Sequence, residues 1–208
     1  MKFDAVILDV DGTVWDSTEL VAKAWTKAAK DCEIDTEITA DRLKGLFGKT
    51  MHEIADALLP DATEEEKNRV MYKSIEEEDK VLAENTVDIT YPEVSSTIKE
   101  LSKKLPVCIV SNCQKGYIEL FMEKANVKSF ITDTECYGNN GKGKADNLRL
   151  LIERNGFLHP CYVGDTLMDE IACREAGVPF IFASYGFGEA KQPVYSIDSF
   201  KNLLNVLN

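Results

Sequence analysis

Histidine is scarce in this sequence of 208 residues, and its cysteines form no close pairs. Only His52 and His159 are present, and none of the six cysteines belongs to a Cys-x-x-Cys pair or a Cys/His cluster. A structural zinc site needs such ligands at short spacings, so we expect none. We expect the cysteines to be free thiols in a reducing cytoplasm, and we assign no role to either histidine.

Excess positive charge and long apolar runs are also missing. The chain has 24 Lys and Arg against 36 Asp and Glu, a net charge of −12. It therefore lacks the basic footprint of a nucleic-acid-binding protein, and an anionic membrane surface would repel it. No run reaches transmembrane length, and the first apolar stretch ends at Asp9 without a signal-peptide cleavage pattern. We expect a cytoplasmic protein without nucleic-acid or membrane partners. An anionic substrate would need positive charge placed locally at its site.

Four short apolar runs are typical of buried parallel strands. They are rich in β-branched or aromatic residues and too short for helices, and they span residues 3–8, 107–110, 161–163 and 179–183. Helical spacing of apolar residues lies between the later runs, as in Leu148, Leu151 and Ile152. Strands that alternate with helices predict an α/β fold with an open parallel sheet and right-handed crossovers.

Residues 16–85 interrupt this alternation, because they contain no convincing strand. One apolar helix face includes Leu20, Ala24 and Trp25. Three helix-start patterns have an acidic residue three positions after a capping residue, at Asp16-x-x-Glu19, Thr50-x-x-Glu53 and Thr63-x-x-Glu66. We therefore predict a helical cap domain at 16–85, inserted into a core domain formed by 1–15 and 86–208.

The segment Asp9-Val10-Asp11-Gly12-Thr13 directly follows the first apolar run. Ligands of open α/β sheets bind beyond the carboxyl ends of the strands. Two carboxylates two residues apart repel each other, and a cation or a shared proton relieves the repulsion. Asp-Gly pairs are also common in turns, so this motif alone leaves a purely structural interpretation open.

Other strand ends also carry polar residues. Ser111-Asn112 follows the second run and can donate hydrogen bonds to phosphate oxygens, and Gly164-Asp165-Thr166 follows the third, with Asp169 four residues beyond Asp165. The cationic segment Gly141-Lys142-Gly143-Lys144 lies between these two sites. Three apolar runs that are followed by Asp, Ser and Asp, in that order and with an intervening Lys, are not expected by chance.

The order of these motifs resembles that of phosphatases of the haloacid dehalogenase-like superfamily, in particular phosphoglycolate-phosphatase-like members with a helical cap. The resemblance covers essentially the whole chain and implies a Rossmann-like core. It also implies a Mg²⁺-dependent phosphatase that hydrolyses a small phosphorylated metabolite through an aspartyl-phosphate intermediate. Asp9 would be the nucleophile, and Asp11 the general acid and then the base. Asp9, the backbone carbonyl of Asp11 and Asp165 would hold the metal ion.

The same resemblance assigns the phosphate-binding groups. Ser111, Asn112 and Lys144 would grip the transferring phosphoryl group, and Asp169 would act through water or by orienting the lysine. We prefer Lys144 to Lys142 because we expect a helix to begin near residue 145 or 146. Lys142 instead lies in a glycine- and asparagine-rich segment, where we expect a loose backbone.

Several alternatives remain. Dehalogenases and phosphonoacetaldehyde hydrolases lack an acid at the position of Asp11, and β-phosphoglucomutases place a histidine in the first cap helix where this chain has Val21. A member of the superfamily that only binds its ligand is a further alternative. Sequence does not determine the substrate, the cap residues that select it, or the oligomeric state. It also leaves open whether Trp15, Lys49 and Cys113 face the site.

Overall fold

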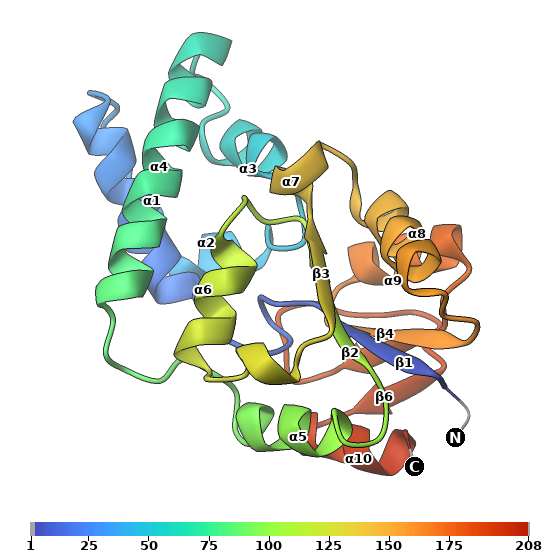
Figure 1. Ribbon diagram of the computed structural model, residues 1–208. Coiled ribbons are helices and arrows are strands. Elements are labelled where there is room, and N and C mark those ends of the chain that lie inside the picture. The colour runs from blue at the N-terminus through green and yellow to red at the C-terminus, as the bar shows by residue number, and fades with distance from the viewer. Residues whose placement is uncertain (1–2, 208) are drawn as a thin grey trace. The chain divides into compact units, whose positions relative to one another are not determined.

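The computed structural model describes residues 3–207, which form two compact units (Figure 1). One unit combines the segment that ends at Asp16 with the segment that begins at Asp88, and the other spans Ser17–Val87. The chain therefore leaves the first unit after its first strand and returns to it before the second.

A six-stranded sheet forms the centre of the first unit. Its strands, in the spatial order β3-β2-β1-β4-β5-β6, are all parallel to their neighbours. They span Ala5–Leu8 (β1), Val107–Ser111 (β2), Asp133–Cys136 (β3), Pro160–Gly164 (β4), Phe180–Ala183 (β5) and Tyr195–Ile197 (β6). This arrangement confirms the predicted α/β fold with an open parallel sheet. Strands β3 and β6, at the two edges, were not expected from the sequence.

Helices connect these strands and cover the sheet. They are α5 (Val94–Leu101), α6 (Tyr117–Lys124), α7 (Tyr137–Asn140), α8 (Lys144–Asn155), α9 (Leu167–Ala176) and α10 (Leu203–Val206), with 3-10 turns at Lys128–Phe130 and Phe200–Asn202. Leu148 and Leu151 of α8 and Cys173 of α9 pack in one cluster with strand residues such as Ile7 and Tyr162. Helices α5 and α10 lie on the other side of the sheet (Figure 1).

The second unit is helical, and its residues 17–87 include no strand. Its helices are α1 (Thr18–Asp31), α2 (Ala40–Lys44), α3 (Met51–Leu58) and α4 (Glu64–Glu84). They enclose an apolar core that includes Val21, Ala28 and Leu43. Within this unit, the buried indole N–H of Trp25 donates to Oε1 of Glu78 at 2.7 Å.

Two of the three predicted helix starts are formed as capping boxes, at Thr50 with Glu53 and at Thr63 with Glu66. The prediction at Asp16 is wrong, because α1 begins at Thr18 with Ser17 at its N-cap position and without a side-chain cap. Asp16 belongs to the sheet unit, where its backbone N–H donates to the carbonyl of Ile89 at 2.9 Å.

Two properties of the described residues bear on the environment of the protein. Among residues 3–207, no helix combines the length and the apolar character that a membrane span requires. All six cysteines are buried and carry free thiols. Burial raises the pKa of the thiols of Cys108 and Cys161 to about 12, so they stay protonated at neutral pH.

Candidate active site

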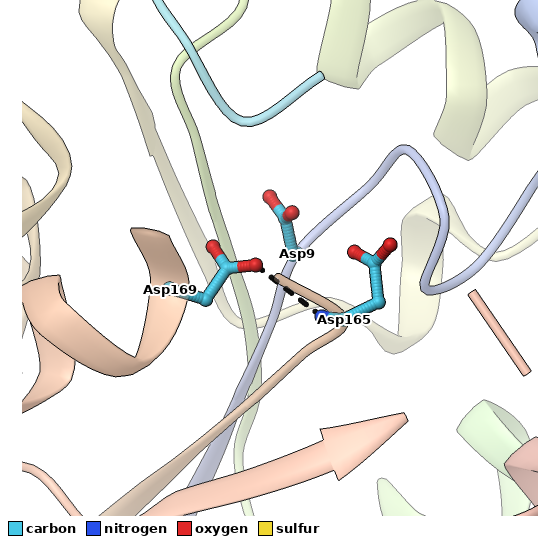
Figure 2. A group of neighbouring side chains, drawn as sticks. All are labelled: Asp9, Asp165 and Asp169. Carbon is cyan, nitrogen blue, oxygen red and sulfur yellow. Dashed lines mark hydrogen bonds between the residues drawn. The ribbon is translucent and has the colours of Figure 1, made fainter. Parts of the chain in front are cut away.

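Three buried carboxylates converge at the carboxyl ends of the central strands. Asp9, Asp165 and Asp169 each offer an oxygen atom, and these atoms all lie within 4.8 Å of one another (Figure 2). Strands β1 and β4 are neighbours in register, with Leu8 opposite Val163, so the residues that follow them emerge together. The first turn of α9 then places Asp169 beside Asp165.

Lys144 brings a positive charge to this cluster. Its Nζ lies 2.9 Å from Oδ1 of Asp9 and 2.5 Å from Oδ1 of Asp169, and the residue is only 5% exposed. Burial by itself lowers the pKa of this lysine, but the charges of Asp169 and Asp9 outweigh it, so the pKa lies above its ordinary value. The ammonium group therefore stays charged between the two carboxylates.

The carboxylates are not fully neutralised by this lysine. Burial raises the pKa of Asp9 to about 7, although Lys144 acts in the opposite direction. Burial, followed by the charge of Asp169, also raises the pKa of Asp165 well above its ordinary value. Among the described residues, Oδ1 of Asp9 accepts no hydrogen bond of good geometry, in spite of its ion pair with Lys144. A buried set of oxygen ligands with excess negative charge fits a hard divalent cation.

Asp169 contacts three neighbours through its two carboxylate oxygens. Its Oδ2 accepts hydrogen bonds from the backbone N–H and the hydroxyl of Thr166, at 3.0 and 2.6 Å, which completes a capping box at the start of α9. The backbone N–H of Asp165 also donates to this oxygen (Figure 2). Its Oδ1 faces Lys144. Asp169 is therefore held firmly and in turn fixes the ammonium group.

A loop after β5 encloses Asp165, and sequence reasoning missed it. The backbone N–H of Phe187 donates to Oδ2 of Asp165 at 2.8 Å. A Cβ atom at Gly186 would lie 2.3 Å from the Asp165 Cβ and 2.4 Å from the carbonyl oxygen of Gly12. The segment Tyr185-Gly186-Phe187-Gly188 follows the fourth predicted strand closely, so the strand-end rule that singled out the other motifs applies here too.

The carboxylate of Asp11 accepts hydrogen bonds from two aromatic side chains. The indole N–H of Trp15 and the hydroxyl of Tyr117 both donate to its Oδ1, at 2.9 and 2.8 Å. All three residues are buried. Trp15 therefore faces a candidate catalytic residue. Tyr117, on α6, was not expected in the site, because its neighbours Ile118 and Phe121 only indicate an apolar helix face.

Ser111 is the last residue of β2, the other neighbour of β1 in the sheet, and Asn112 follows it directly. Ser111 is buried, and Asn112 is partly exposed. Cys113 is buried next to them, and burial, followed by a hydrogen bond with Cys136, raises the pKa of its thiol. It is therefore an unreactive thiol at neutral pH. Lys49 belongs to the helical unit, directly before the N-cap of α3.

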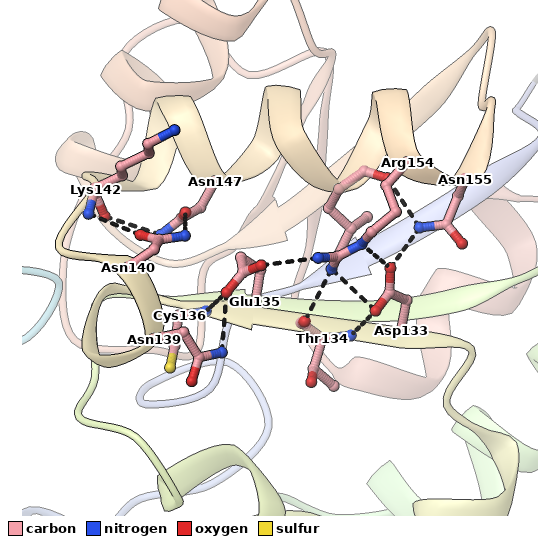
Figure 3. Close-up of polar contacts among 11 residues, drawn as sticks. Asp133, Thr134, Glu135, Cys136, Asn139, Asn140, Lys142, Asn147, Arg154 and Asn155 are labelled. Carbon is pink, nitrogen blue, oxygen red and sulfur yellow. Dashed lines mark hydrogen bonds and ion pairs between the residues drawn. The ribbon is translucent and has the colours of Figure 1, made fainter.

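The loop before Lys144 is more ordered than the sequence suggested. The buried Asn147 donates from Nδ2 to the Lys142 carbonyl at 2.9 Å and accepts from the Asn140 amide at 2.8 Å. Oδ1 of Asn140 accepts from the backbone N–H of Lys142 (Figure 3). The expected loose backbone is wrong, because side-chain amides close the loop, and α8 begins at Lys144 itself. The side chain of Lys142 is nevertheless exposed.

The far end of α8 is tied to the edge strand β3. Arg154 donates to Oδ2 of Asp133 at 2.8 Å and to Oε2 of Glu135 at 3.0 Å, and Asn155 also donates to Asp133 (Figure 3). Together with the Asn147 contacts, these bonds anchor both ends of the helix that carries Lys144.

A family model described as haloacid dehalogenase-like hydrolase matches residues 6–183. The chain belongs to this family. Its fold is also that of solved structures from several bacteria, which are 18–19% identical to it. A predicted phosphoglycolate phosphatase from Haemophilus somnus, 18% identical, superimposes with a TM-score of 0.87 over 100% of this chain and 99% of its own.

Two further structures show the same fold. A haloacid dehalogenase-like hydrolase from Streptococcus pneumoniae is 19% identical, and a predicted phosphatase from Clostridium acetobutylicum is 18% identical. Each has a TM-score of 0.86 over 100% of this chain and 99% of its own. Comparison with curated protein sequences gave no match.

Proposed function

We propose that this chain is a Mg²⁺-dependent phosphatase that hydrolyses a small phosphate monoester through an aspartyl-phosphate intermediate at Asp9. The observation that carries the proposal is the buried group of Asp9, Asp165 and Asp169, with Nζ of Lys144 2.9 Å from Asp9. Membership of the hydrolase family supports it. The names of the neighbours from H. somnus and C. acetobutylicum point to phosphate esters.

The proposed reaction has two steps. A carboxylate oxygen of Asp9 attacks phosphorus, the bond from phosphorus to the ester oxygen breaks, and Asp11 protonates the departing oxygen. Asp11 then takes a proton from water, which attacks the phosphorus of the aspartyl phosphate. This releases inorganic phosphate and restores the Asp9 carboxylate.

The buried charges are arranged to make the first step possible. A carboxylate approaches a phosphate dianion only when the charge of both is offset. The carboxylates of Asp9 and Asp165 and the backbone carbonyl of Asp11 would hold Mg²⁺, which supplies part of that positive charge when bound. Lys144, kept charged by Asp169 and Asp9, supplies the rest.

The remaining groups bind and orient the phosphoryl oxygens. Ser111 and Asn112 can donate hydrogen bonds to them from the end of β2. Asp169 holds Lys144 in place through its Oδ1. Positioned donors cost no reorganisation during the reaction, which is why a buried, paired lysine suits this role.

We assign the unit Ser17–Val87 the role of a cap that selects the substrate and excludes water during phosphoryl transfer. Val21, at the position where a mutase would have a proton-relaying histidine, lies in the apolar core of this unit, which favours hydrolysis over phosphosugar mutation. The partner is a small phosphorylated metabolite. The six free thiols support a cytoplasmic location.

The proposal is tested with purified protein and 4-nitrophenyl phosphate. We expect turnover with Mg²⁺, its loss in a chelator, and its recovery when Mg²⁺ is restored. Asp9→Asn should be folded, as judged by circular dichroism, and inactive, because an amide does not form the acyl phosphate. Asp198→Asn, at an exposed position, is the matched control and should remain active. Turnover that survives exhaustive chelation, or an active Asp9→Asn protein, would contradict the proposal.

A further inference from the structure

Two aromatic residues hold the carboxyl group of Asp11. The Nε1 atom of Trp15 lies 2.9 Å from Oδ1 of Asp11, and the hydroxyl of Tyr117 lies 2.8 Å from the same oxygen. Trp15 is 1% exposed and Tyr117 is 2% exposed. Buried N–H and O–H groups need acceptors, and in both cases the acceptor is the candidate acid–base group.

Local structure fixes both donors. The chain turns back after Asp11, with the backbone N–H of Gly12 donating to the carbonyl of Trp15 at 2.9 Å, so that the indole returns toward the carboxyl group. The indole ring packs edge-on against the rings of Tyr117 and Phe121, with centroids 5.4 and 5.3 Å apart. Tyr117 is the first residue of α6, so the first turn of that helix sets the position of its hydroxyl.

The carboxyl group of Asp11 thus has a setting different from that of the other acidic groups. Asp9, Asp165 and Asp169 form the group of three carboxylates, and Lys144 pairs with Asp9 and Asp169. Two aromatic donors on Oδ1 use both lone pairs of that oxygen.

We infer that Trp15 and Tyr117 are positioning residues that hold Asp11 for proton transfer to the leaving oxygen. The inference rests on the proposed phosphatase function. In this inference, two neutral hydrogen-bond donors orient the carboxyl group of Asp11, whereas Lys144 and the other carboxylates act on the phosphoryl group. Loss of either donor should leave attack by Asp9 intact and impair only the delivery of the proton.

Two substrates of nearly the same shape separate these effects. Phenyl phosphate releases a phenolate about as basic as that of tyrosine, whose pKa is about 10, so its departure depends strongly on a proton. 4-Nitrophenyl phosphate releases a much weaker base, whose departure depends less on one. The kcat/KM of each substrate reports the steps up to departure of the leaving group and therefore excludes the later attack of water.

The experiment measures the ratio of kcat/KM for 4-nitrophenyl phosphate to kcat/KM for phenyl phosphate, with Mg²⁺ present. Tyr117→Phe and Trp15→Phe should each raise this ratio about tenfold, a part of the roughly 10²- to 10⁴-fold contribution of a general acid. Asp11→Asn should raise it further. Tyr195→Phe is the matched control, because it removes a tyrosine hydroxyl at an exposed position on the edge strand β6. This control should leave the ratio unchanged.

Tyr117→Phe decides the question if Trp15→Phe does not fold, because it removes a single oxygen atom and preserves the ring packing. A Tyr117→Phe protein that is active on both substrates with an unchanged ratio would overturn the inference and leave the proposed phosphatase standing. A wild-type protein that hydrolyses neither ester would overturn the proposed function, and the inference with it.

Discussion

Replacing Gly186 with alanine should weaken metal binding, because the loop after β5 has no room for a side chain. The added Cβ would lie 2.3 Å from the Cβ of Asp165 and 2.4 Å from the carbonyl oxygen of Gly12. Both distances are more than about 1 Å shorter than an ordinary contact between heavy atoms, which is roughly 3.5–4.0 Å. Neither neighbour is the free end of a flexible side chain, so we expect the loop itself to move.

A shift of this size would break the bond from the Phe187 N–H to Oδ2 of Asp165, which is now 2.8 Å. Loss of a partner that orients a metal ligand typically weakens metal affinity by about 10- to 100-fold. Overpacking should also lower the free energy of unfolding by about 1–3 kcal/mol. Titration of phosphatase activity with Mg²⁺ measures the first effect, and urea denaturation measures the second.

Gly45→Ala is the control for this experiment. Its added Cβ would have only the Arg42 carbonyl within 4 Å, at 3.9 Å, and its backbone is already helical. We expect it to change neither Mg²⁺ affinity nor stability appreciably. A Gly186→Ala protein that binds Mg²⁺ as tightly as the wild type would show that the loop does not position Asp165.

Two further predictions concern the charged groups. Lys144→Ala should lose at least about a hundredfold in kcat, by analogy with removal of one oxyanion donor, whereas Lys142→Ala should lose little. Steady-state kinetics with one substrate compares them, and the opposite ranking would refute the assignment. Because the folded-state pKa of Asp9 is raised from 3.8 to about 7, the folded state without metal binds an extra proton between these values, and its stability should fall as pH rises from about 4 to about 7. Mg²⁺ should therefore raise Tm more at pH 8 than at pH 6. Thermal denaturation measures this, and an equal shift at both pH values would contradict it.

Sequence reasoning succeeded where the signal was local. The four apolar runs became strands because burial on both faces of a parallel sheet demands uninterrupted apolar residues. The edge strands were not predicted, because they lack such uninterrupted apolar runs. Strand β3 carries Asp133 and Glu135, which bind Arg154. In the sequence, these acidic residues indicate a polar loop. Strand β6 has only three residues, of which two are exposed.

In the candidate site too, residues with a local sequence signal could be predicted, and residues brought in by tertiary contacts could not. Asp9 and Asp165 could be proposed from the sequence because Asp9 follows an apolar run directly and Asp165 follows one after a single glycine. The contact between Tyr117 and Asp11 joins residues 106 positions apart, and no periodicity records it. Phe187 contributes its backbone N–H, a group that every non-proline residue has. Contacts of this kind appear only when the tertiary fold is known.

Asp169 joins the folding of a helix to the placement of a charge. One of its oxygens closes the first turn of α9 with Thr166, and the other orients Lys144 at the first turn of α8. If that turn of α9 opened locally, the ammonium group would lose a partner while the sheet stayed intact. Mild heat or denaturant should therefore reduce turnover before any global unfolding is detected, which makes activity a sensitive measure of local order at this helix start.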